Sequence, residues 1–151
     1  MKLNEANTRK QLIDRALELV GWKDEYLNCE YVFTDGKKTP GGGKGKQCSV
    51  DYLLQYNNTN VGLIEAKREG LPITEGLQQA QDYGGKLGVR YVYSTNGRGI
   101  FEYDMDLDTG QQIDSFPTPE ELYQRVQGTN PQKVKMLKEP LVQEGIMIPR
   151  Y

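Results

Sequence analysis

The chain has 151 residues, which is enough for one compact domain but not for two of ordinary size. Hydrophobic residues make up 36% and charged residues 26% of the sequence, a balance typical of a folded chain rather than a disordered one. Nineteen basic residues stand against 21 acidic ones, for a net charge of -2. This balance excludes a protein that holds nucleic acid mainly through bulk positive charge.

Histidine is absent from the sequence, which excludes Ser-His and Cys-His catalytic triads and every metal site built on histidine. Any catalysis must therefore use carboxylates, lysines and metals bound by oxygen. No apolar run approaches the roughly 20 residues of a membrane span, and no apolar signal-peptide core is present, so we expect a cytoplasmic protein without membrane contact. Cys29 and Cys48 lack metal-site spacing and are expected to be free thiols.

The first half of the chain predicts a helix, a strand and a hairpin. Asn4 caps a helix with apolar residues at the 3.6 period, and the helix ends at Gly21. Residues 29–33 read as a strand, and residues 34–47 form a loop rich in glycine and lysine. Residues 50–56 and 61–67 are expected to pair as a hairpin across the turn-forming residues 57–60.

The second half predicts a helix, two strands and a further helix. The first of these helices starts near Thr74, and strands follow at 90–94 and 99–103, with a weaker segment at 111–116. Thr118 and Pro119 begin the last helix, which ends by Gly128. The order α-β-β-β-α-β-β predicts an α/β domain over residues 1–128, with a mixed central sheet flanked by helices. Residues 129–151, interrupted by prolines, are expected to be a C-terminal lead-out.

Glu65 and Lys67 lie where the apolar stripe of a strand should continue. By the period of two they share one strand face with Val61 and Leu63. Charged groups on the inward face of a sheet need each other, a metal ion or a wet cleft. The plain alternative is a surface ion pair between Glu65 and Lys67, with Asp51 solvated.

Asp51 lies on the neighbouring strand, and the hairpin register decides whether it reaches Glu65. If Gln55 pairs with Val61, Asp51 lies opposite Glu65, whereas pairing of Val61 with Tyr56 turns Asp51 away. We predict the first register, or a bulge with the same effect. Two carboxylates at cross-strand distance suit Mg²⁺ or Mn²⁺, and a nearby lysine at position 67 could orient water or contact phosphate.

Two helical positions add weaker candidates. Glu5 lies on one helical stripe with positions 8, 12, 16 and 19, which would aim it toward the sheet, although an acid in a first turn is also favoured by the helix dipole. Gln79 and Tyr83 are four residues apart, so they share a helix face where they could position a phosphate or sugar. The alternative for this pair is an ordinary amphipathic helix border.

The lysines of the glycine-rich loop could touch DNA phosphates, although a solvated loop explains them equally well. They are Lys37, Lys38, Lys44 and Lys46. The loop fails the spacing of a nucleotide-binding P-loop, because Gln47 follows Lys46 and no glycine occupies position 40. We therefore expect no ATP site in this chain.

Asp51 followed by Glu65-x-Lys67 within this order of elements resembles the PD-(D/E)xK nuclease superfamily. Five blocks of sequence, at residues 4–9, 63–68, 79–83, 94–97 and 116–122, together resemble the N-terminal nuclease domain of type I restriction enzyme R subunits, the HsdR family. The match covers most of residues 4–125. Val50 stands where the motif's name has proline, and this departure leaves the acids intact.

The resemblance implies roles for individual residues. Asp51, Glu65, Lys67 and Glu5 would be catalytic, and the metal would be held by Asp51, Glu65 and the backbone carbonyl of Ala66. Support at the active site and on DNA would come from Gln79 and Tyr83, with Lys44 and Lys46 as further candidates for DNA contact. The implied cofactor is Mg²⁺, for which Mn²⁺ substitutes.

The resemblance also implies a function. The chain would be the endonuclease domain of an R subunit, hydrolysing phosphodiester bonds of double-stranded DNA after ATP-driven translocation by the rest of the subunit. Residues 148–151 resemble the stretch that leads into the motor domains, which are absent from this chain, and the expected partners include methylation and specificity subunits. Two alternatives remain: a catalytically silent DNA-binding or subunit-docking module, and a stand-alone repair-type nuclease.

Overall fold

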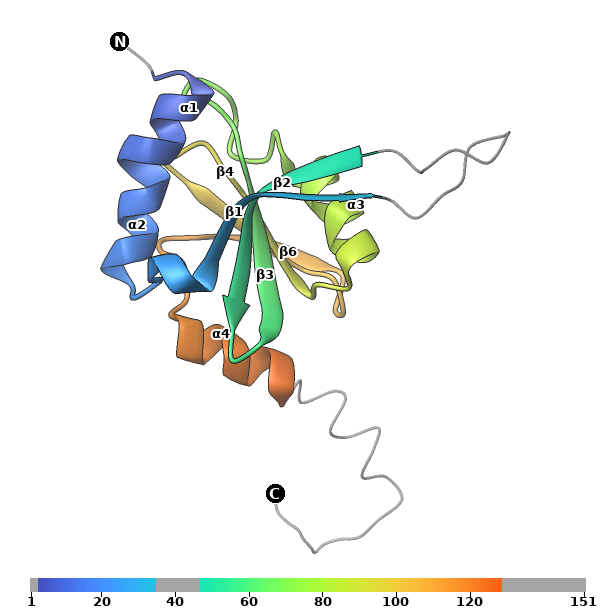
Figure 1. The fold of residues 1–151 in the computed structure, drawn as a ribbon. Helices are drawn as coiled ribbons and strands as arrows, with labels where there is room; N and C mark the ends of the chain where they lie inside the picture. Colours follow the sequence, from blue (N-terminus) through green and yellow to red (C-terminus); the bar gives the residue numbers. More distant parts are fainter. Residues whose placement is uncertain (1–2, 35–46, 129–151) are drawn as a thin grey trace, which may run out of the picture.

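The computed structural model describes residues 3–34 and 47–128, and Figure 1 shows how their elements are arranged. The lysines at positions 37, 38, 44 and 46 lie outside the described residues, and so does the expected lead-out over residues 129–151. The DNA contacts and the domain boundary placed on those segments therefore stay predictions. Within the described part of the chain, no helix is both long and apolar enough to cross a membrane.

The described elements form a six-stranded sheet with helices against it. The helical segments are α1 (Glu5–Thr8), the π-helical turn η1 (Arg9–Ile13), α2 (Asp14–Leu19), the 3-10 turn η2 (Asp24–Tyr26), α3 (Leu77–Leu87) and α4 (Pro119–Gln127). The strands are β1 (Leu27–Thr34), β2 (Gln47–Tyr56), β3 (Thr59–Ala66), β4 (Tyr91–Thr95), β5 (Ile100–Asp104) and β6 (Thr109–Ile113). The prediction of a mixed α/β fold is confirmed.

The strands lie side by side in chain order, from β1 to β6. Neighbouring strands are antiparallel except for β3 and β4, which are parallel and are joined by the crossover helix α3. Parallel strands need such a crossover because a tight turn cannot join them. The ends of β3 and β4 therefore meet at one edge, next to the start of α3.

Two apolar clusters hold the helices on the sheet. One joins strand side chains such as Tyr52 and Ile64 to Leu17 of α2 and Leu122 of α4. The other joins Leu53, Leu63 and Val92 to Ala80 and Tyr83 of α3. In Figure 1, α3 accordingly lies across the sheet from α1 and α2. Leu63 and Ile64 belong to different clusters, as the alternation of side chains along a strand requires.

The N-terminal helix has the predicted ends but an unpredicted π turn in its middle. Asn4 Oδ1 accepts a hydrogen bond from the Asn7 N–H at 2.8 Å, and Gly21 adopts a φ of +99°. The Asp14 N–H donates to the Arg9 carbonyl, five residues back, which inserts one extra residue into the helix. Residues after the turn are therefore shifted around the helix axis relative to residues before it.

The π turn overturns the predicted stripe of positions 5, 8, 12, 16 and 19. Thr8 is buried, but beyond the turn the buried positions are Ile13 and Leu17, whereas Leu19 is 80% exposed. Glu5, before the turn, is exposed rather than directed into the core. The expectation that Glu5 continues a core-facing row is therefore wrong, because Glu5 lies in the exposed first turn of the helix. The π turn accounts for the later part of the stripe, where the buried row passes through Ile13 and Leu17.

The β2–β3 hairpin has the predicted register, and a bulge produces it. Asn57 and Asn58 both have positive φ, as a two-residue turn of type I′ requires. Next to the turn Gln55 pairs with Asn60, but a register shift after Leu54 changes the pairing from that point onward. The shift is equivalent to the bulge that the sequence predicted. It also moves Val61 to the cluster of Ile64, so Val61 does not share a face with Leu63 as expected.

The two later helices differ in how well their starts were predicted. Helix α3 begins at Leu77, with Gly76 as its N-cap, rather than near Thr74. Before it, the Glu75 and Leu77 N–H groups donate to carbonyls three residues back, so this stretch is a series of turns. Helix α4 begins as predicted, because Thr118 Oγ1 accepts a hydrogen bond from the Glu121 N–H at 3.1 Å.

Candidate metal centre

The hairpin register brings Asp51 and Glu65 together. Tyr52 pairs with Ile64, so the preceding residue of β2 lies level with the following residue of β3. The Ala66 N–H donates to Asp51 Oδ2 at 2.8 Å, and the Asp51 N–H donates a long hydrogen bond to Glu65 Oε1 at 3.4 Å. Each carboxylate is therefore fixed by the backbone of the strand that carries the other.

Glu65 is a buried acid next to a second acid. Only 3% of its surface is exposed, which contradicts the alternative of a surface ion pair with Lys67. Burial, followed by the charge of Asp51, raises the pKa of Glu65 to about 8, although the Asp51 N–H and the charge of Lys67 lower it. Near neutral pH this carboxyl group therefore holds a proton that a cation at the same place would displace.

These two acids suit a small divalent cation. Mg²⁺ is ordinarily held in proteins by one or two carboxylates and completes its shell with water and substrate phosphate. Within residues 3–34 and 47–128, no group of three or more Asp, Glu, Cys or His side chains is placed to hold a metal. The centre thus offers two carboxylates, and a divalent cation would remove the repulsion that raises the pKa of Glu65. The ligand role of the Ala66 carbonyl stays a prediction.

Lys67 follows β3 directly and lies at the start of α3. Its N–H donates to the Thr95 carbonyl at 2.9 Å, which continues the pairing of β3 with β4. The Gly76 N–H donates to Ser94 Oγ at 3.0 Å, and a Cβ on Gly76 would lie 3.2 Å from Glu65 Cβ and 3.4 Å from Lys67 Cε. Close approach of α3 therefore packs both charged side chains against a residue without a side chain.

Gln79 and Tyr83 face one another on α3. Gln79 Nε2 donates to the Tyr83 hydroxyl at 2.8 Å, and the buried Tyr83 ring packs edge-on against Phe33, with centroids 5.4 Å apart. Gln79 lies in the first turn of the helix that begins against Glu65. Tyr83 thus has a packing role, and a role for either residue toward DNA stays a prediction.

Glu5 is the first residue of α1. It is exposed in the first helical turn, where the positive end of the helix dipole favours an acid. The next residue, Ala6, lines a pocket together with Asp51. This placement agrees with the dipole explanation, and the catalytic role of Glu5 stays a prediction.

Two further charged residues, Arg9 and Glu30, lie at this site and were not predicted from the sequence. Arg9 Nη1 lies 3.5 Å from Asp51 Oδ1 and 3.3 Å from Glu30 Oε2. Arg9 follows Glu5 by four residues, the spacing that places two side chains on one helix face. That spacing could have identified Arg9, whereas Glu30 could not have been found from any local pattern, because it reaches the site through an irregularity of β1.

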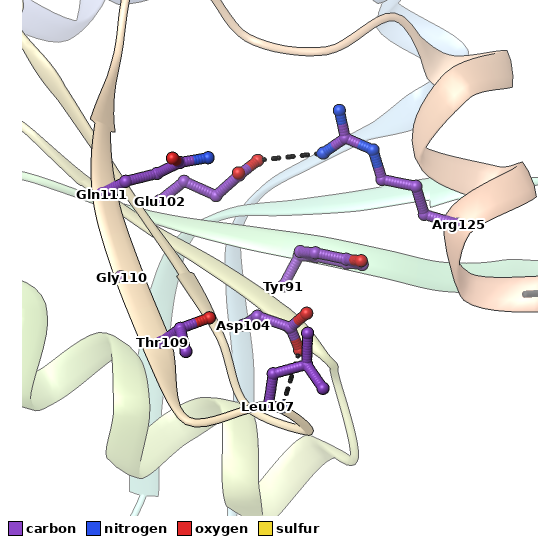
Figure 2. A pocket seen from close by; sticks show the side chains of 8 residues that line it. All are labelled: Tyr91, Glu102, Asp104, Leu107, Thr109, Gly110, Gln111 and Arg125. Carbon is purple, nitrogen blue, oxygen red and sulfur yellow. Dashed lines mark hydrogen bonds and ion pairs between the residues drawn. The ribbon is translucent and has the colours of Figure 1, made fainter. Parts of the chain in front are cut away.

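A second pocket lies away from these residues, between β5, β6 and α4 (Figure 2). Its charged side chains have partners. Asp104 is bound at 2.8 and 2.9 Å by two nitrogens of Arg90, which does not itself line the pocket, and Arg125 Nη1 lies 3.2 Å from Glu102 Oε2. Glu102 also accepts a hydrogen bond from the Tyr93 hydroxyl at 2.7 Å. This network fastens α4 to the sheet, and none of the predicted site residues lines the pocket.

Comparison with known proteins relates the chain to one kind of enzyme subunit. It is 29% identical over 134 residues to the Type I restriction enzyme EcoAI endonuclease subunit of Escherichia coli, covering 82% of this chain and 16% of that protein. A solved structure described as a fragment of an HsdR subunit of a type I restriction enzyme, from Vibrio vulnificus YJ016, matches with a TM-score of 0.73 and 38% identity. No family model matches the chain.

The chain spans about a quarter or less of the length of these relatives. The structural match covers 83% of this chain but 26% of the solved chain. Both relatives are described as subunits of type I restriction enzymes, one of them as the endonuclease subunit. The predicted resemblance to the HsdR family is thereby confirmed by sequence and by structure.

Proposed function

We propose that this chain, a relative of part of the R subunits of type I restriction enzymes, is a metal-dependent endonuclease domain that hydrolyses phosphodiester bonds of double-stranded DNA. The observation that carries the proposal is the pairing of the Asp51 and Glu65 carboxylates across β2 and β3. A carboxylate pair, one member of it buried, costs folding stability, so its presence calls for a cation.

Each residue of the site would have a separate role in metal binding or phosphate hydrolysis. Asp51 and Glu65 would hold Mg²⁺ or Mn²⁺, and the cation would supply Lewis-acid activation of water and charge stabilisation at the phosphate. Lys67 would orient the attacking water or bind a phosphate oxygen, because it is the cation that follows β3 directly after the two acids. Gly76 keeps this end of the site narrow by letting α3 approach.

The net charge is consistent with cleavage by this chain of DNA that other domains and subunits bind and deliver. A domain with a net charge of -2 should bind duplex DNA weakly by itself, because affinity for DNA depends on neutralising phosphates. We therefore propose that DNA is delivered by ATP-driven motor domains of the same subunit, and that methylation and specificity subunits choose the sequence. No nucleotide-binding role is assigned to this chain.

Calorimetric titration with Mn²⁺ tests the centre without requiring those partners. We expect saturable binding by the wild-type chain that is lost in both Asp51→Asn and Glu65→Gln. Glu18→Gln, which removes an exposed acid from α2, serves as the matched control and should keep the wild-type affinity. Absence of Mn²⁺ binding by the wild type, with and without duplex DNA, would favour a catalytically silent module.

A further inference from the structure

Arg9 occupies a position beside the candidate metal centre that the proposed chemistry has not used. It lines a pocket of about 350 Å³ whose other walls include Glu30, Asp51 and Tyr52. Asp51 therefore has one carboxylate oxygen bound to the Ala66 N–H and the other directed toward Arg9 in this pocket. A ligand that reaches Asp51 through the pocket would meet the guanidinium.

The Arg9 guanidinium has two acidic partners, but not all of its N–H groups are hydrogen-bonded. Nη1 lies 3.3 Å from Glu30 Oε2 and 3.5 Å from Asp51 Oδ1, while only 22% of the side chain is exposed. The buried Nε–H has no hydrogen-bond partner among the described residues. Because a buried donor without a partner is costly, the guanidinium has hydrogen-bonding capacity that the described residues do not satisfy.

The backbone on both sides is arranged to bring Arg9 and Glu30 together. Glu30 has a φ of +52°, which is unusual for a residue with a side chain, and it is skipped in the ladder between the pairs Cys29–Tyr52 and Tyr31–Val50. The skipped position of β2 is Asp51. The irregularity in β1 thus lies directly opposite the candidate metal ligand and directs an acid toward Arg9.

The π turn of the N-terminal helix positions Arg9, the partner of Glu30. Arg9 begins this turn, and its carbonyl accepts the Asp14 N–H. The Tyr52 hydroxyl donates to Asp14 Oδ1 at 2.5 Å and lies 3.4 Å from the Arg9 carbonyl. Tyr52 is the residue after Asp51, so the π turn is tied through Asp14 to the strand at the metal centre. Single π turns of this kind often occur at functional sites, where they re-aim one side chain.

We propose that Arg9 is a phosphate-binding residue of this centre and that Glu30 is its positioning residue. The inference rests on the proposed metal-dependent cleavage of DNA. Without metal, the guanidinium neutralises Asp51; with a cation on Asp51 and Glu65, Glu30 keeps the guanidinium in place and its free donors bind an oxygen of the DNA backbone. Arginine suits this task because its planar fork can serve a carboxylate and a phosphate together.

Mn²⁺ affinity in the absence of DNA tests the first half of the proposal. Arg9→Gln removes a cation that competes for Asp51, so we expect Mn²⁺ to bind about threefold to tenfold more tightly. Arg15→Gln removes the same charge from an exposed position on α2 and should leave the affinity within about twofold of wild type. Weaker Mn²⁺ binding in Arg9→Gln would overturn the proposal, because it would indicate a structural role alone.

Duplex binding tests the second half. With Ca²⁺ in place of Mn²⁺ to prevent cleavage, we would measure the affinity for a duplex of about 20 base pairs against salt concentration, beginning at low salt. Arg9→Gln should reduce the slope of log affinity against log salt by about 0.9, the loss of one phosphate contact, whereas Arg15→Gln should not. An unchanged slope in Arg9→Gln, or no duplex binding by the wild type, would overturn the phosphate contact.

Two further variants show whether a negative result comes from a folding defect. Mn²⁺ binding by the wild type then distinguishes a failure of this inference from a failure of the proposed function. Arg9→Lys keeps the charge, so it should restore the salt slope and, because it lacks the fork, restore duplex affinity only in part. Glu30→Gln should lower duplex affinity while leaving thermal unfolding near that of wild type. If the wild type binds no Mn²⁺, the proposed metal centre fails; if it binds Mn²⁺ and the Arg9 variants match the Arg15 control, only this inference fails.

Discussion

Asp51 and Glu65 are cross-strand neighbours, and the charge of Asp51 acts on the buried Glu65 carboxyl group. The Asp51 N–H and the Glu65 carboxylate form a long hydrogen bond, and burial together with the Asp51 charge raises the pKa of Glu65 to about 8. The folded chain therefore favours a protonated Glu65, whereas an unfolded chain releases that proton near the ordinary pKa of about 4.3. Folding, metal binding and proton binding are linked through this single carboxyl group.

We predict that the metal-free chain loses stability as pH rises from 5 to 8.5. A group whose pKa is raised by folding contributes stability that is complete below its unfolded pKa and is lost as pH rises through its folded pKa. For Glu65 this interval runs from about 4.3 to about 8, and the expected loss is about 2–4 kcal/mol. Thermal unfolding in EDTA across this pH range measures it.

The matched variant for this prediction is Glu65→Gln. It keeps the size of the side chain and removes its titration, so its stability should change much less than that of the wild type over the same range. A wild-type unfolding temperature that stays level or rises between pH 5 and 8.5 would show that Glu65 is not the buried acid of this description.

Mn²⁺ affinity should rise with pH up to about 8. Because the cation replaces the proton on Glu65, binding below pH 8 releases close to one proton, and affinity should increase by up to about tenfold per pH unit. Titration in two buffers with different ionisation enthalpies counts the released protons. Release of no proton at pH 6.5 would mean that the cation binds elsewhere.

The sequence was sufficient to predict this pair because its signal is local. Charged residues follow apolar ones at the end of a hydrophobic strand, and the asparagines at the hairpin turn limit the register to two choices. The bulge after Leu54 selects between them. The order of helices and strands along the chain followed from similar local patterns of apolar period and turn residues.

Glu30 could not be predicted, and neither could the orientation of Arg9 toward it, because both depend on departures from regular geometry. The π turn at residues 9–13 changes the phase of the first helix, and nothing in its apolar spacing marks that turn. Glu30 has a left-handed φ although glutamate is not a turn-forming residue, so the sequence does not mark this position. The start of α3 was misplaced for a similar reason, because Thr74 has the side chain of a cap but lies in a preceding turn.

Gly76→Ala should disturb the metal centre without altering its chemical groups. A Cβ at this position would lie 3.2 Å from both Glu65 Cβ and Ser94 Oγ, and both residues are buried, so neither can move freely. We expect a loss of about 1–3 kcal/mol in unfolding free energy and several-fold weaker Mn²⁺ binding.

The control for this substitution is Gly85→Ala on the same helix. A Cβ on Gly85 would meet nothing closer than Met105 Cε at 4.0 Å, so the variant should be neutral or more stable by about 0.5–1 kcal/mol. Equal Mn²⁺ affinity in both variants would contradict the tight packing of α3 against the centre.

Removal of the Arg90 guanidinium should destabilise the fold and leave the metal centre unchanged. Arg90 and Asp104 side chains are 10% and 11% exposed, and Figure 2 shows Asp104 on the wall of the second pocket. Arg90→Gln leaves a buried carboxylate without its cation, so we expect the unfolding free energy to fall by about 2–4 kcal/mol in chemical denaturation.

The control is Arg98→Gln, which breaks the ion pair between Arg98 and Glu69. Because the Arg98 side chain is 64% exposed, this change should cost at most about 1 kcal/mol of unfolding free energy. Both variants should bind Mn²⁺ as the wild type does, because neither arginine contacts Asp51 or Glu65. Weaker Mn²⁺ binding in folded Arg90→Gln would indicate that the second pocket and the metal centre are coupled through the sheet.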